Sequence, residues 1–167
     1  HGVTRDPESM THPPDGMWYY QQIALGFNYR MTDIQAALGR SQLKRIDEFV
    51  ARRQQLAERY DILLEGLPVV PQERHPDSQS SFHLYVIRVS EQSHGKVFTF
   101  LREAGFGVNL HYIPVHTQPY YRQMGFSQGD FPAAEAYYRE AISLPIYPEL
   151  DESQQDAVVS ALNEVLG

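Results

Sequence analysis

The sequence predicts an α/β domain, in which a small sheet is backed by helices and is preceded by an extended arm and one long helix. Three observations lead to this prediction. A strand, a helix and a second strand follow one another between residues 82 and 112, and helical spacing without proline runs from residue 32 to residue 66. The composition, 42% hydrophobic and 21% charged over 167 residues, is typical of one globular domain with a sizeable core.

The charge balance argues against nucleic acid and against anionic membranes as partners. Fourteen Lys and Arg stand against 21 Asp and Glu, which gives a formal net charge of -7.

The chain has no cysteine, so disulfides, thiol nucleophiles and Cys-ligated zinc are excluded, and we expect a cytoplasmic protein. No apolar run approaches the roughly 20 residues of a membrane span. Because the chain opens at His1 without a methionine, we expect a piece of a longer protein.

The first part of the chain predicts little regular structure. Residues 1–16 mix proline and glycine with polar residues, which predicts a loop or a disordered end. Residues 17–27 are aromatic and partly alternating, which predicts an extended arm or strand.

One long helix is predicted for residues 32–66. Thr32 and Gln35 stand in the positions of a capping box, and Gly66 is a plausible C-terminal glycine. Apolar residues recur between them at helical spacing, at Ile34, Leu38, Leu43, Ile46, Val50, Ala57, Tyr60 and Leu64.

The sheet is predicted from the middle of the chain. Residues 82–89 are apolar on both faces and predict a central strand. Residues 97–104 have helical spacing, and residues 107–112 predict a second strand. Two further helices are predicted for residues 133–142 and 151–166, the last opening with a capping box of Asp151 and Gln154.

The segment before the long helix carries groups that suit an anion. Asn28 offers two amide donors and Arg30 a planar cation, beside the positive end of a helix dipole, and this combination is typical of a phosphate site. A structural alternative stays open, in which Asn28 makes a turn and Arg30 pairs with Asp33.

A second group of polar rings lies at His111-Tyr112-Ile113-Pro114-Val115-His116, where a strand runs into a loop. Two imidazoles and a phenol could bind a phosphate or a sugar hydroxyl. No carboxylate lies nearby in sequence, so we predict no metal site here, although two imidazoles could in principle ligate a metal. The structural alternative is that these rings only pack and make ordinary hydrogen bonds.

Together, Gly26-Phe27-Asn28-Tyr29-Arg30-Met31-Thr32-Asp33-Ile34-Gln35-Ala36-Ala37-Leu38-Gly39 and the His111–His116 segment resemble the C-terminal portion of the nucleotide-sugar aminotransferases of the DegT/DnrJ/EryC1/StrS family. The resemblance covers nearly the whole chain. It implies the C-terminal small domain of a fold type I transferase that depends on pyridoxal 5'-phosphate (PLP) and works as a homodimer. Residues 1–31 would come from the end of the large domain, 32–66 would form the connecting helix, and 67–167 the small α/β domain.

The resemblance also implies roles for individual residues. Asn28 would donate a hydrogen bond to the cofactor phosphate of the partner subunit. Arg30 would bind the substrate's diphosphate or, alternatively, hold the local loop. The nucleotide-sugar pocket would be lined by His111, Tyr112, Ile113, Pro114 and His116, with Tyr112 and His116 as hydrogen-bonding groups. No catalytic residue is expected in this chain, because the lysine that forms the Schiff base lies upstream in the family, and neither Lys44 nor Lys96 has its surroundings. The chain alone is therefore expected to be inactive.

The resemblance is greatest to the branch of the family that transfers an amino group from glutamate to C4 of a UDP-linked 4-keto-6-deoxy-hexosamine, in pseudaminic acid biosynthesis. Three alternatives remain open. Some relatives carry histidine in place of the lysine and are PLP-dependent sugar dehydratases. The chain could also be a noncatalytic α/β binding or assembly module, or a histidine-based metal hydrolase.

Overall fold

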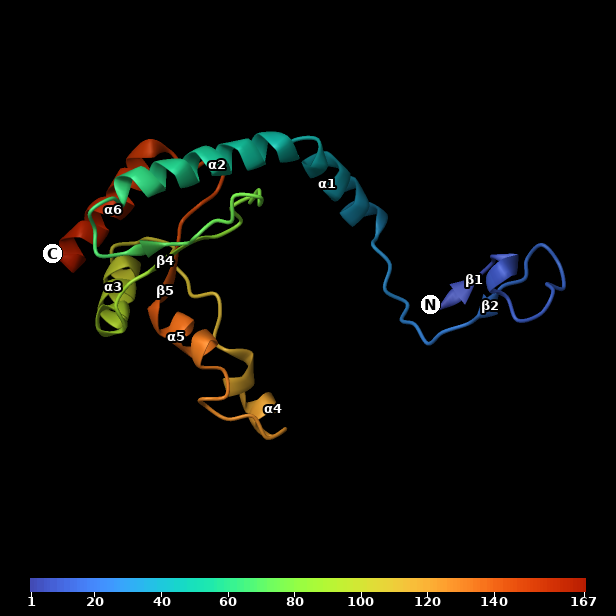
Figure 1. The fold of residues 1–167 in the computed structure, drawn as a ribbon. Coiled ribbons are helices and arrows are strands. Elements are labelled where there is room, and N and C mark those ends of the chain that lie inside the picture. Colours follow the sequence, from blue (N-terminus) through green and yellow to red (C-terminus); the bar gives the residue numbers. More distant parts are fainter. The chain divides into compact units, whose positions relative to one another are not determined.

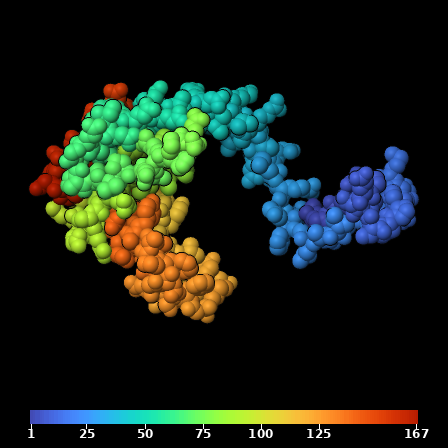
Figure 2. Space-filling model, viewed as in Figure 1, coloured from blue at the N-terminus to red at the C-terminus, as the bar shows by residue number.

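The computed structural model describes residues 1–167 and divides them into two compact units, His1–Arg45 and Ile46–Gly167 (Figure 1). The second unit holds the predicted α/β architecture, with a small sheet and helices packed around one core. The predicted fold class is therefore confirmed. In the space-filling view, the residues of the second unit, coloured from teal to red, form one packed body (Figure 2).

The first unit begins with a small antiparallel hairpin, in which β1 (Val3–Thr4) pairs with β2 (Gln21–Gln22). A short 3-10 helix, η1 (Pro7–Ser9), lies in the loop between them. Gln21 is buried, and its side chain accepts from the backbone N–H of Thr11 and donates to the carbonyl of His12. The loop predicted for residues 1–16 is therefore found, but β1 and η1 lie within it, and a strand and a polar side chain from beyond residue 20 hold it in place.

The first unit ends with α1 (Asp33–Leu43), whose predicted cap is confirmed. Thr32 Oγ1 accepts from the N–H of Gln35 at 3.3 Å, and the Gln35 side chain accepts from the N–H of Thr32 at 2.9 Å. The prediction of one continuous helix to residue 66 is wrong, since α2 (Ile46–Leu63) is a separate helix. The N–H of Arg45 bonds to the carbonyl of Gln42, three residues back, which tightens the last turn of α1 and ends it. No proline or glycine marks this place in the sequence.

The sheet of the second unit has three antiparallel strands, in the order β3 (Val70–Pro71), β4 (Tyr85–Arg88) and β5 (Ala141–Leu144). β4 is the predicted central strand. The second predicted strand, residues 107–112, is reduced to one bridge between Asn109 and Ser143.

A helix is found where the spacing of residues 133–142 predicts one, but the last two of these residues belong to the strand β5. The helix α5 (Pro132–Glu140) ends one residue before β5, and all four residues of β5 are buried. β5 pairs residue for residue with β4, from Tyr85 opposite Leu144 to Arg88 opposite Ala141. Its conformation is therefore fixed by a strand more than 50 residues away, which local spacing does not reveal.

Three helices enclose the core of the second unit: α2, α3 (Glu91–Glu103) and α6 (Glu152–Leu166). The predicted capping box of Asp151 and Gln154 is confirmed at the start of α6. The side chains that meet in the core come from all three helices and from the sheet, and they include Leu56, Ala57, Tyr60, Ile87, Val97, Leu101, Ile142, Leu144, Val158 and Leu162. None of the helices combines the length and the apolar character that a membrane span requires.

A long connection leads from Asn109 to α5 and carries the second predicted site segment. It contains a short 3-10 helix, η2 (Val115–Thr117), and one further turn of helix, α4 (Pro119–Arg122).

Candidate functional site

Asn28 and Arg30 lie in the first unit, in the segment between β2 and α1, and both are exposed. Neither side chain makes a hydrogen bond or an ion pair within residues 1–167, so Arg30 does not pair with Asp33. The amide and the guanidinium are therefore open to solvent just before the N-terminus of the 11-residue helix α1. This arrangement can hold an anion, because amide donors, a planar cation and the helix N-terminus all favour negative charge.

The segment His111–His116 does not line one continuous surface. His111, which is half-buried, lines a cavity of about 690 Å³ in the second unit, whereas Pro114 and His116 line a separate cavity of about 360 Å³. Tyr112 and Ile113, which lie between His111 and Pro114 in sequence, line neither cavity and are exposed, Tyr112 to 72%. The peptide bond between His111 and Tyr112 is cis.

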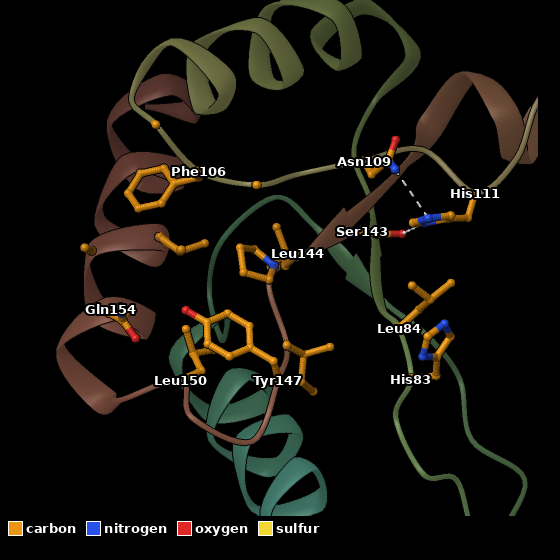
Figure 3. A pocket seen from close by; sticks show the side chains of 16 residues that line it. His83, Leu84, Phe106, Asn109, His111, Ser143, Leu144, Tyr147, Leu150 and Gln154 are labelled. Carbon is orange, nitrogen blue, oxygen red and sulfur yellow. Dashed lines mark hydrogen bonds between the residues drawn. The ribbon is translucent and has the colours of Figure 1, made fainter. Parts of the chain in front are cut away.

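The larger cavity has a polar end and an apolar wall (Figure 3). Asn109, His111 and Ser143 form the polar end, and Leu144 and Leu150 belong to the apolar wall. The cavity is also lined by the rings of Phe106 and Tyr147 and by the side chains of Gln154 and His83. No Asp, Glu, Lys or Arg is among the lining residues, and the volume is in the range of small-molecule sites.

Two hydrogen bonds hold His111 in the polar end of this cavity. Nδ1 lies 2.8 Å from the hydroxyl of Ser143, and Nε2 lies 3.5 Å from the amide nitrogen of Asn109. Ser143 and Asn109 are themselves tied together, because the N–H of Ser143 donates to the carbonyl of Asn109 at 2.8 Å and the reverse bond is 3.2 Å. Sequence reasoning missed Ser143 as a site residue, because it lies on β5, which the helical spacing of residues 133–142 concealed.

Two arginines of α2 donate hydrogen bonds to backbone carbonyls in the loops around the same cavity. Arg53 donates to the carbonyls of Phe82, His83 and Ile146 at 3.2–3.4 Å, and Arg52 donates to the carbonyl of Leu150 at 2.8 Å. Three of these four residues line the cavity. These guanidinium groups therefore fix the loops that form the cavity wall and do not point a charge into it.

His116 is buried, with 7% of its surface exposed, and makes a hydrogen-bond contact with a carboxylate that the sequence did not predict. Its Nε2 lies 2.8 Å from Oε1 of Glu135, which also accepts from the N–H of Gly129 at 2.7 Å. The N–H of Gly129 and, secondly, the bond to His116 hold the pKa of Glu135 below its ordinary value. Because one ring nitrogen is bound to Glu135, a contact of His116 with substrate would have to use Nδ1. No local signal identifies Glu135, which is 19 residues away.

The smaller cavity beside His116 is almost entirely apolar. It is lined by Pro114, Val115, Tyr121, Phe126 and Phe131, and the ring of Phe131 lies 4.8 Å from that of His116. Pro114 thus contributes shape to this cavity.

The chain is similar to one family of aminotransferases over nearly its whole length. A sequence model described as the DegT/DnrJ/EryC1/StrS aminotransferase family matches residues 8–163. The spore coat polysaccharide biosynthesis protein SpsC of Bacillus subtilis is 38% identical over 159 residues, which are 91% of this chain and 41% of SpsC.

Solved structures show the same similarity. The PMP-form of the putative sugar aminotransferase Spr1654 from Streptococcus pneumoniae has a TM-score of 0.83 and 30% identity, with 99% of this chain and 42% of that chain covered. Helicobacter pylori PseC, an aminotransferase involved in the biosynthesis of pseudoaminic acid, has a TM-score of 0.82 and 25% identity, covering 99% of this chain and 43% of that one. The chain thus spans about two fifths of the length of these relatives.

Proposed function

The chain belongs to the DegT/DnrJ/EryC1/StrS aminotransferase family, and we propose that it is the C-terminal part of a PLP-dependent nucleotide-sugar aminotransferase. The match of the family to residues 8–163 carries this proposal. The structures of Spr1654 include a PLP-form and a PMP-form, which supports PLP as the cofactor of the family. When bound, PLP supplies the electron sink for transamination, and the protein supplies binding and orientation.

The exposed donors of the first unit fit the phosphate of this cofactor. In the proposed homodimer, the amide of Asn28 donates to the cofactor phosphate held by the partner subunit. Arg30 binds the diphosphate of the substrate. The support is that both side chains are exposed and have no partner within the chain, so that binding an anion breaks no existing contact.

The nucleotide sugar is proposed to contact the His111–His116 segment. His111 lies in the larger cavity, and the exposed phenol of Tyr112 is free to donate a hydrogen bond to a sugar or phosphate oxygen. Ile113, on the exposed surface, and Pro114, in the wall of the smaller cavity, contribute shape, and His116, held by Glu135, contacts the substrate through Nδ1.

The proposed substrate is a UDP-linked 4-keto-6-deoxy-hexosamine that receives an amino group at C4 from glutamate, as in pseudaminic acid biosynthesis. The likeness to Helicobacter pylori PseC supports this finer assignment.

Neither lysine of this chain is proposed to be the catalytic one. Lys44 lies in the turn that ends α1, and Lys96 in α3 donates from Nζ to the carbonyl of Val165 at 3.0 Å. We place the catalytic lysine in the part of the protein that precedes this chain in its relatives. The 167 residues alone are then inactive.

The test is to give the full-length protein PLP, glutamate and the UDP-linked 4-keto-6-deoxy-hexosamine, and to identify the product by mass spectrometry. A 4-amino sugar together with 2-oxoglutarate supports the proposal. A deoxygenated sugar without an incorporated amine would instead identify a dehydratase. Failure to bind PLP would leave a noncatalytic module.

A further inference from the structure

The orientation of the Asn109 amide fixes which nitrogen of His111 carries the proton. Oδ1 of Asn109 accepts from the N–H of Leu110 at 2.8 Å, so its NH2 group, which can only donate, faces Nε2 of His111 at 3.5 Å. In the neutral ring, Nε2 is therefore the acceptor and Nδ1 carries the hydrogen. The Nδ1–H then donates to the hydroxyl oxygen of Ser143, 2.8 Å away.

This assignment leaves the hydroxyl hydrogen of Ser143 without a partner. The residue is only 4% exposed, and its backbone N–H and carbonyl are both bound to Asn109. No other hydrogen bond involves its hydroxyl, and the side chain lies in the wall of the larger cavity (Figure 3). A buried hydroxyl with an unused hydrogen can donate to a ligand oxygen in that cavity.

We propose that Ser143 is a substrate-binding residue that donates a hydrogen bond to an oxygen of an uncharged ring, with His111 and Asn109 as its positioning residues. The cavity has no lysine or arginine to balance a phosphate, and burying an anion there without a counter-charge would be costly. The rings of Phe106 and Tyr147 in its wall can pack against the face of a ring. Uncharged rings occur in both parts of a nucleotide sugar, in the nucleoside and in the hexose. The identity of the ligand as a nucleotide sugar rests on the proposed function.

The first experiment determines the tautomer of each histidine by 15N NMR of the full-length protein labelled at histidine. His111 is expected to carry its hydrogen on Nδ1. His94 and His116 are internal controls of the opposite kind, because their Nε2 atoms donate to the carbonyl of Ala141 and to Glu135. Asn109→Asp places an acceptor opposite Nε2 and is expected to move the His111 hydrogen there. A wild-type His111 with its hydrogen on Nε2 alone would overturn the proposal.

The second experiment measures the binding of uridine, N-acetylglucosamine and inorganic pyrophosphate to the full-length protein. We expect Ser143→Ala to weaken binding of one of the two ring compounds roughly 3- to 10-fold, the usual worth of one hydrogen bond, and to leave pyrophosphate unchanged. The compound affected tells whether the cavity takes the nucleoside or the hexose. Ser78→Ala, on an exposed loop where the hydroxyl bonds only to the carbonyl of His75, is the matched control. Asn109→Ala, at an exposed position, is a second variant in case Ser143→Ala fails to fold, and is expected to act in the same direction.

The experiments distinguish failure of the Ser143 ring site from failure of the proposed aminotransferase function. If neither ring compound is affected by Ser143→Ala or Asn109→Ala, or if pyrophosphate is affected as strongly, the ring site is wrong even when the full-length enzyme makes the amino sugar. If the full-length protein makes no amino sugar but the tautomer and the Ser143-dependent binding are found, the ring site stands and the proposed function fails.

Discussion

The two units of the chain use their apolar side chains in opposite ways. Every member of the buried core lies in residues 46–167. In residues 1–45 only Gln21 is buried, while Met17, Leu25, Tyr29 and Ile34 are each more than 80% exposed. The second unit therefore has its own source of stability, and the first does not.

This difference indicates what each unit contributes. A run of exposed large apolar side chains is typical of a surface that another protein surface covers. In the first unit this run includes Phe27, Tyr29 and Met31, which flank Asn28 and Arg30 in sequence. The proposed homodimer would cover these side chains and bring the two donors to a partner subunit, while the second unit would supply a preformed cavity.

The largest difference between the two units is expected in the free energy of unfolding, when one leucine in each unit is replaced by alanine. Leu162→Ala removes a fully buried side chain of α6 and should lower the free energy of unfolding by about 2–5 kcal/mol, because it leaves a cavity in the core. Leu38→Ala, in the exposed helix α1, should change it by less than about 0.5 kcal/mol. Urea unfolding of both variants, followed by circular dichroism, measures the two values. Equal losses would show that the first unit has a core after all.

A second contrast separates cofactor binding from folding. In the full-length enzyme, Asn28→Ala should weaken PLP binding roughly 10- to 100-fold, since a hydrogen bond to a charged group is lost. The melting temperature of the apoenzyme should hardly change, because the side chain is exposed and unpartnered within the chain. PLP absorbance after gel filtration measures occupancy. Equal occupancy in the variant and the wild type would remove Asn28 from the site.

Self-association of the 167-residue chain should depend on the first unit. Replacing Leu25 and Ile34 together by serine should weaken it by about tenfold, because two large exposed side chains leave the apolar surface. Ile62→Ser, at an exposed position in α2, should have little effect. Sedimentation velocity at several concentrations distinguishes these outcomes. A wild-type chain that stays monomeric at high concentration would contradict the prediction.

The smallest expected effect is on how the stability of the second unit depends on pH. The pKa of Glu135 is held below its ordinary value of 4.5, so its carboxylate stabilises the fold above that pH, and this contribution is lost as the pH falls through the lowered value. Glu135→Gln should therefore reduce the melting temperature at pH 7, and the difference from wild type should shrink in acid. Glu149→Gln is the control, because the Glu149 side chain is exposed and makes no hydrogen bond within the chain. A difference that stays constant from pH 7 to pH 3 would show that the carboxylate charge is not responsible.

Part of the candidate site could be predicted from sequence. The resemblance identified Asn28 and Arg30, and their exposure agrees with a role in binding, which stays a prediction. Glu135 and Ser143 could not be predicted, because their partners His116 and His111 lie 19 and 32 residues away and no repeating pattern connects them.

The sequence by itself determined the features that arise within a few residues of one another. The caps at Thr32 and Asp151 and the buried face of α6 follow from contacts three or four residues apart, which the order of side chains sets directly. Only the tertiary structure decided that residues 141–144 form a strand, that the long helix is interrupted after Leu43, and that His111 and His116 face different cavities. A strand and a buried polar side chain acquire their conformation from partners far along the chain, and those partners are known only once the chain has folded.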